Sequence, residues 1–155
     1  MTATQVCDVF GNYGVLGGYL SANFISAGQY TAPSSATLKS LSINCTGSCQ
    51  CILAVYAYNA GSPGALLADT GVVSCVAGWN TFPIPDTAIT GGVNYFLAAI
   101  TSNAGVGPQA DQLYPLTNER YVSYPWATAA ASGIGTHAGW SIDSAYYDMS
   151  ASQCP

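Results

Sequence analysis

Six cysteines are the residues of this chain whose type and spacing could most directly do chemistry. An even number of cysteines in a short chain favours disulfide bonds formed in an oxidising environment. The rival interpretation is a metal site, but the C-x3-C-x-C spacing of the middle three differs from the paired spacing of zinc knuckles. We therefore expect disulfides, with no bound metal and no cofactor. The six are Cys7, Cys45, Cys49, Cys51, Cys75 and Cys154.

Two of these cysteines stand near the ends of the chain. Because the termini of compact domains are often close together, we expect Cys7 to be bridged to Cys154. The other four would then form two further bridges at one end of the domain and leave no free thiol. Six cysteines allow many pairings, so this connectivity is a hypothesis.

No other residues form a catalytic motif. His137 is the only histidine, and no G-x-S-x-G sequence supports a serine-hydrolase triad around it. Aspartates such as Asp69, Asp86 and Asp111 stand in turn-like sequence, which explains them without a glycosidase pair or a calcium site. We expect a protein that is not an enzyme, with His137 as an ordinary loop residue. A hydrolase with a cryptic site is a weaker alternative.

The aromatic residues suggest a different chemistry, because aromatic faces stack on sugar rings. Trp126 lies in loop-like sequence just after Tyr124, so we take Trp126, Tyr121 and Tyr124 as the candidate platform for a carbohydrate. Trp140, which alternates with Ile142, is instead expected in the core. The alternative for the tyrosines is ordinary packing within strands.

One N-x-[ST] sequence, Asn44-Cys45-Thr46, makes Asn44 a glycosylation candidate at the expected end of a strand. The first residues show neither the basic start nor the apolar stretch of a signal peptide. Either a signal was removed, or the protein never used one. The second case would suit a virus structural protein that is released by lysis and oxidised afterwards.

Charge is scarce in this chain. Charged residues make up 6% of it, against about 25% in an ordinary protein. A net charge of −5 with only two basic residues, Lys39 and Arg120, argues against binding to nucleic acid or anionic lipid. No apolar run reaches the roughly 18 residues of a membrane span, so we expect no membrane insertion. Such a weakly charged surface suits a protein that packs against copies of itself.

Short strands separated by turns are the elements that must position these residues. Segments 51–58 and 93–101 are apolar on both faces, which predicts two central strands. Pro83 and Pro85 place the strand over 79–84 at a sheet edge, because proline cannot donate to a ladder. Helical signals are weak, and 127–131 is too short for a helix. We therefore expect one all-β domain over 1–155, an antiparallel sandwich or barrel stapled by disulfides.

Three stretches follow one another in a familiar order: a Ser-Pro-Gly turn with its strand over 62–71, a Gly-Trp strand over 77–81, and an aromatic strand over 91–98. On these residues, the chain over about 21–101 resembles a β-sandwich module found in bacterial surface proteins and phage structural proteins. The resemblance implies a single antiparallel β-sandwich, a jelly-roll-like display module without catalytic residues. It also implies that Trp79 lies in the core. The cysteines and the long segment 102–136 depart from the usual pattern.

Together these features lead us to expect a non-enzymatic structural or adhesion component, located on an extracellular or virion surface. Examples are a phage capsid decoration or fibre protein and a cell-surface filament subunit. Its expected partners are copies of itself or other structural subunits, with surface glycans as a further option and no nucleic acid. Residues 2–10 are a candidate arm for such contacts. The main alternative is a lectin-like carbohydrate-binding module.

Overall fold

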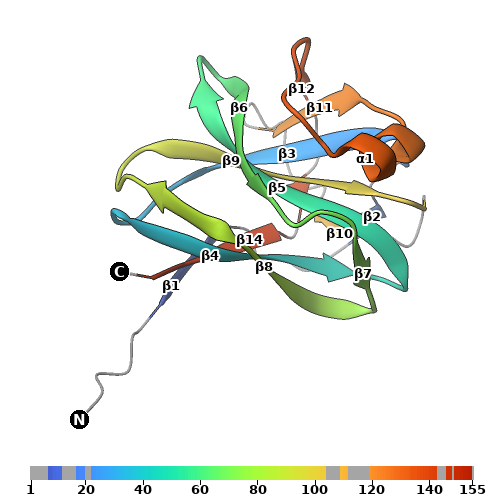
Figure 1. Cartoon of the computed structure of the whole chain (residues 1–155), viewed down its shortest axis with the longest axis horizontal. Helices are drawn as coiled ribbons and strands as arrows, with labels where there is room; N and C mark the ends of the chain where they lie inside the picture. The colour runs from blue at the N-terminus through green and yellow to red at the C-terminus, as the bar shows by residue number, and fades with distance from the viewer. Residues whose placement is uncertain are drawn as a thin grey trace.

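The computed structural model describes residues 7–11, 17–19, 22–103, 109–111, 119–142, 146–147 and 149–154. All strand pairs in this part of the chain are antiparallel, and the strands form two main sheets that pack face to face (Figure 1). This confirms the predicted all-β sandwich. The strand pairings do not by themselves establish the jelly-roll connectivity that the resemblance implied.

Among the residues that the structure describes, the first sheet has four strands, with β1 and β8 at its two edges. Their order is β1 (Asp8–Gly11), β14 (Met149–Cys154), β4 (Ala36–Cys45) and β8 (Gly78–Ile89). Since β8 contains Pro83 and Pro85, the prediction that these prolines mark a sheet edge is confirmed.

The second sheet has seven strands and is the larger of the two. Its order is β12 (Ser141–Ile142), β11 (Glu119–Ser123), β3 (Phe24–Thr31), β9 (Asn94–Thr101), β5 (Cys49–Asn59) and β6 (Ser62–Asp69), with β7 (Val73–Cys75) also paired to β5. A small third sheet joins β13 (Tyr146–Tyr147), β10 (Gln109–Asp111) and β2 (Gly17–Tyr19).

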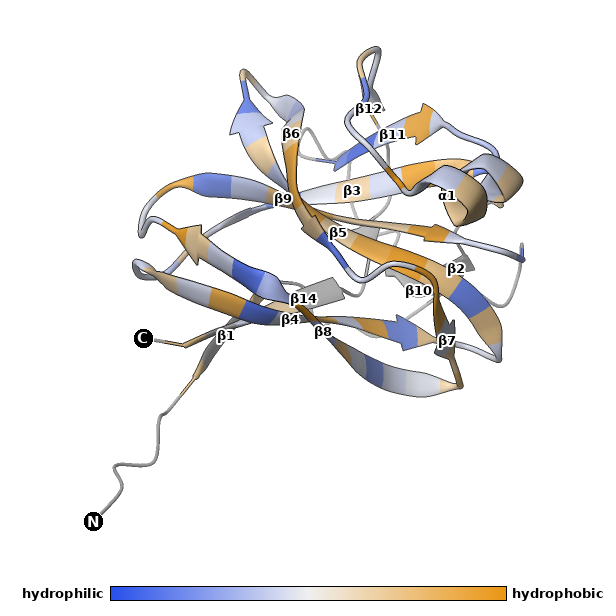
Figure 2. Cartoon of the chain, viewed as in Figure 1, coloured by the Kyte–Doolittle hydropathy of each residue, from blue (hydrophilic) through white to orange (hydrophobic). Residues whose placement is uncertain are grey.

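Strands β5 and β9 lie inside the larger sheet and are buried on both faces, as their unbroken apolar sequences predict. Because side chains alternate along a strand, each strand contributes to two separate cores. Leu53 and Leu97 belong to the core between the sheets. Tyr56 and Phe96, which lie on the same two strands but point the opposite way, belong to a core on the other face of the larger sheet. Figure 2 shows the hydrophobic residues along β5.

The second core is covered by a short helix, α1 (Trp126–Ser132), and by the segment that follows it. The expectation of no helix here was wrong. Four alanines favour the helical conformation, Pro125 precedes the first turn, and Gly133 ends the helix with a positive φ of 85°. The inward-facing Ala129 is 1% exposed. Among the described residues no helix is both long and apolar enough to cross a membrane.

The two ends of the described chain meet in the four-stranded sheet. Strand β1 pairs with β14, and Asp8 lies opposite Gln153. The Cys7–Cys154 disulfide closes this pair, with 4.4 Å between the Cα atoms, so the predicted bridge is confirmed. Residues 8–10 of the candidate arm are therefore part of the domain's own sheet, while residues 2–6 lie outside the described residues.

Candidate functional site

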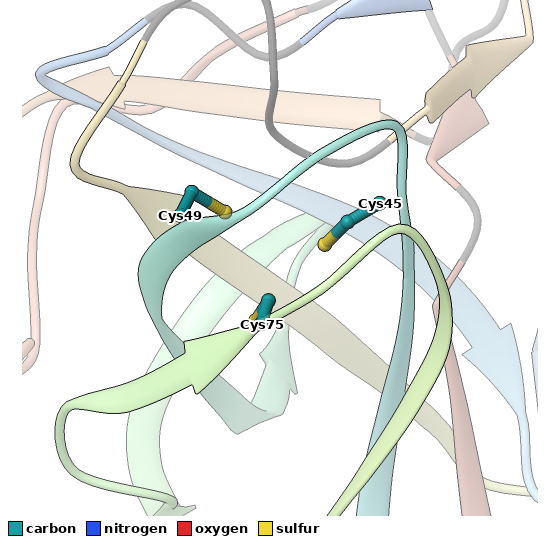
Figure 3. A group of neighbouring side chains, drawn as sticks. All are labelled: Cys45, Cys49 and Cys75. Carbon is teal, nitrogen blue, oxygen red and sulfur yellow. The ribbon is translucent and has the colours of Figure 1, made fainter.

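Four cysteines gather at one end of the sandwich. Cys45 ends β4, Cys49 begins β5 after a three-residue turn, and Cys75 ends β7. The Sγ atoms of these three residues all lie within 4.8 Å of one another. Figure 3 shows the side chains of Cys45 and Cys49 pointing toward each other, with Cys75 on the neighbouring strand. Cys51, the fourth, is fully buried and follows two residues after Cys49.

The pairing within this cluster differs from the sequence-based hypothesis. Cys51 is bonded to Cys75, with 6.8 Å between their Cα atoms, while Cys45 and Cys49 are free thiols. One of the two expected bridges is thus present and the other is absent. The alternation of β5 explains the gathering, because Cys49 and Cys51 both point into the core between the sheets. Which sulfurs bond depends on strand register, which the sequence does not reveal.

Burial controls the chemistry of the two thiols. Burial, and secondarily the neighbouring Cys49, raises the pKa of Cys45 to about 12. Burial also raises the pKa of the Cys49 thiol, against a smaller lowering effect of its hydrogen bond with Cys45. Both groups are therefore neutral thiols near pH 7. Since the thiolate is the nucleophile, the pair is unsuited to nucleophilic catalysis.

A second feature adjoins the cysteine cluster. Residues 76–79, which we call the apolar tip, follow Cys75 directly, carry no charge and are all exposed. Val76 is 60% exposed and Trp79 is 44% exposed. Asn80 fixes the backbone of the tip: its side-chain oxygen accepts from the Val76 N–H at 3.0 Å, and its side-chain nitrogen donates to the Val76 and Gly78 carbonyls at 2.8 Å.

The prediction that Trp79 lies in the core was wrong, and the strand register explains why. Directly opposite residues on antiparallel strands share a face. Asn80 lies opposite the buried Ile43, so Asn80 has the inward position and Trp79 the outward one, opposite Asn44. The sequence alone does not give this register.

The predicted carbohydrate platform is not brought together on one surface. Tyr124 and Trp126 are half-buried and pack against the second core. On β11 the side chain of Val122 belongs to that same core, so the adjacent Tyr121 points to the other face of the sheet. There its ring makes an edge contact with Phe24 at a centroid distance of 5.9 Å. The structure therefore places Tyr121 on a different face of the sheet from Tyr124 and Trp126.

His137 is part of the cover over the second core. Its Nε2 donates to the Ile134 carbonyl, and its ring lies 4.4 Å from that of Tyr124 and 6.3 Å from that of Trp140. Trp140 is half-buried and donates from Nε1 to the His137 carbonyl at 3.0 Å. These contacts give His137 a packing role.

Two further polar residues, Asn44 and Glu119, lie at the ends of strands. Asn44, the glycosylation candidate, is half-buried and is the next-to-last residue of β4. Glu119, the one glutamate of the chain, is fully buried at the start of β11, a position that sequence reasoning missed. Gly28 on β3 lies directly opposite Glu119. A Cβ atom added at Gly28 would lie 2.7 Å from Oε2 of Glu119, so the glycine leaves room for the carboxylate.

No family model, curated protein or solved structure matches this chain significantly. The two disulfides indicate an oxidising environment outside a reducing cytoplasm.

Proposed function

We propose that this domain is a non-enzymatic structural or adhesion component of an extracellular or virion assembly, in which copies of the chain contact one another. The assemblies we favour are a phage capsid decoration or fibre and a cell-surface filament. The observation that carries the proposal is the apolar tip, because an exposed, charge-free apolar surface is typical of a contact site.

The apolar tip runs into β8, which is an edge strand within the part of the chain that the structure describes. Edge strands are commonly guarded by charges or prolines, since their open backbone groups can pair with another chain. In β8 the prolines and the charged residue, Pro83, Pro85 and Asp86, all lie in the second half of the strand. The first half, residues 78–82, contains neither a proline nor a charged residue. Tip and open edge together form one continuous surface for a partner.

The tip is also held in place before any partner binds. Three hydrogen bonds with the Asn80 side chain, one accepted and two donated by it, fix the backbone of the tip. The Cys51–Cys75 disulfide ties the residue before the tip to β5. A contact that is already ordered loses less conformational entropy on binding. This rigidity supports a role in stable contacts rather than in an adaptable ligand site.

A second copy of the chain is the partner that fits this surface best. Copies related by a two-fold axis place the same strand of each chain side by side and antiparallel, which suits an open edge such as that of β8. Electrostatic repulsion between copies is weak, because each carries only nine charged residues. One basic residue, Lys39, is moreover paired with Asp86 of β8 at 2.5 Å.

Electron microscopy or light scattering of native material tests this function. We expect a regular multi-copy assembly whose contacts bury more than about 1,000 Å² each, the level that separates specific interfaces from crystal packing. A protein that stays monomeric and binds one glycan tightly on a sugar array would contradict the proposal and favour the lectin-like alternative.

A further inference from the structure

We propose that Cys45, Cys49 and Cys75, once the Cys51–Cys75 disulfide is reduced, form a thiolate site for a soft cation, Zn²⁺ or Cu⁺. Such a site goes against the sequence-based expectation of no metal. It does not depend on the proposed function, because it rests on the sulfur cluster alone.

The geometry of the sulfurs carries this inference. Two thiolates bound to one zinc at about 2.3 Å each, in a tetrahedral arrangement, have their sulfurs about 3.8 Å apart. The three Sγ atoms here lie within 4.8 Å of one another, so shifts of about 1 Å at most bring them to a common ion. They come from three separate backbone positions, the ends of β4 and β7 and the start of β5, which surround the space from different sides (Figure 3).

The donor set selects the class of metal. The three side chains offer sulfur only, and thiolates prefer Zn²⁺, Cu⁺ and related soft cations over Mg²⁺ or Ca²⁺. The sulfurs are also shielded from water, since the exposed fractions are 1% for Cys45, 7% for Cys49 and 2% for Cys75. A bound cation would offset the cost of burying thiolate charge in this place.

Metal and disulfide exclude each other at Cys75. In the structure its sulfur is bonded to Cys51 and is not available as a thiolate. Reduction by a thiol or phosphine reductant supplies two electrons and two protons, breaks this S–S bond and gives two thiols. Metal binding then releases one proton from each thiol that coordinates. Cys51 is freed by the same step and, as the former bonding partner of Cys75, is a candidate for a fourth ligand.

The test uses the full-length chain, reduced with a phosphine in the absence of oxygen and checked for retained β-structure by circular dichroism. Co²⁺ serves as the spectroscopic probe for Zn²⁺, and Cu⁺ is titrated separately against a coloured chelator. We expect one ion per chain, with thiolate-to-cobalt absorption that Zn²⁺ abolishes. Tight Cu⁺ binding with weak Zn²⁺ binding supports the same site with Cu⁺ as its cation.

Matched variants assign the ligands. Cys45→Ser and Cys49→Ser should each weaken binding at least about tenfold, while the double variant Cys7→Ser/Cys154→Ser, which lacks the distant pair, should bind as the unaltered chain does. X-ray absorption of the cobalt form of the unaltered chain should show at least three sulfur ligands, which does not depend on any variant folding. Absence of saturable binding to the reduced chain, fewer than three sulfur ligands, or equal binding to the oxidised chain would overturn the proposal.

Discussion

Cys49 lies directly opposite Cys75 in the β5–β7 ladder, yet the sulfur of Cys75 is bonded to Cys51, two residues further along β5. The thiol of Cys49 is therefore left beside that of Cys45, and the two form a buried pair. This end of the sandwich is therefore closed by one disulfide, where the sequence led us to expect two.

Counting thiols in the unreduced protein tests this pairing. We expect two alkylated cysteines per chain after unfolding without reductant, identified by peptide mass spectrometry as Cys45 and Cys49. In the folded protein both should react slowly, because both are buried and neutral near pH 7. Finding no free thiol would show that a third bridge forms after all, and a free Cys51 would contradict the assigned pairing.

The bridge between the chain ends should be a large contributor to stability. The double variant Cys7→Ser/Cys154→Ser opens a loop of 147 residues in sequence separation. The chain-entropy model gives a loss of about 5 kcal/mol in the free energy of unfolding for such a long loop. Denaturant unfolding measures this loss. The variant Cys45→Ala/Cys49→Ala, which removes two cysteines but no bridge, is the control and should lose clearly less.

Tyr56 should make the protein less stable in alkaline solution. Its hydroxyl donates to the Gly135 carbonyl at 2.7 Å, and burial, followed by the charge of Asp69, raises its pKa above the usual value of 10.0. In the unfolded chain this tyrosine ionises above about pH 10, whereas in the folded chain it stays neutral, so the stability it contributes is present at lower pH and falls as the pH rises further.

The variant Tyr56→Phe separates this effect from that of other groups. It should lower the free energy of unfolding by about 1–2 kcal/mol at pH 7 and reduce the further loss between pH 9 and 11. Tyr58→Phe is the matched control, since Tyr58 is 42% exposed on the same strand and should change stability by less than about 0.5 kcal/mol. An unchanged pH dependence in Tyr56→Phe would disprove the assignment.

His137 should matter for packing and not for a reaction. Its ring contacts Tyr124 and Trp140 over the second core, so His137→Ala should lower the free energy of unfolding by about 1–2 kcal/mol. The size of the assembly should stay the same. If a hydrolytic activity is found in the protein and this variant lowers it by about 100-fold or more while stability is unchanged, the packing role is wrong.

The sequence was sufficient to predict features that depend on local pattern. Strands β5 and β9 were predictable because apolar residues occupy both the odd and the even positions. Such a pattern places a strand inside a sheet that is covered on both faces. Pro83 and Pro85 identified β8 as an edge strand because a proline has no backbone N–H to donate to a neighbouring strand, whatever the rest of the fold. The Cys7–Cys154 bridge followed from the general closeness of chain ends.

Features that depend on register or on distant packing were not predictable in this way. Trp79 faces outward because of its alignment with Asn44, and Cys75 bonds Cys51 because of how β7 meets β5. Helix α1 is stabilised by the sheet face that it covers, since seven residues are too few to form a stable helix alone. In each case the deciding partner is far away in the sequence.

The most direct test of the proposed assembly is a comparison of self-association by sedimentation velocity over a wide range of protein concentration. The unaltered chain should form multimers, and Trp79→Ser should weaken their formation at least about tenfold while circular dichroism stays unchanged. Ile142→Ser is the matched control, because Ile142 is 65% exposed on β12 of the other sheet, and it should associate as the unaltered chain does. An unaltered chain that sediments as a monomer at every concentration, or a Trp79→Ser variant that assembles normally, would contradict the proposal.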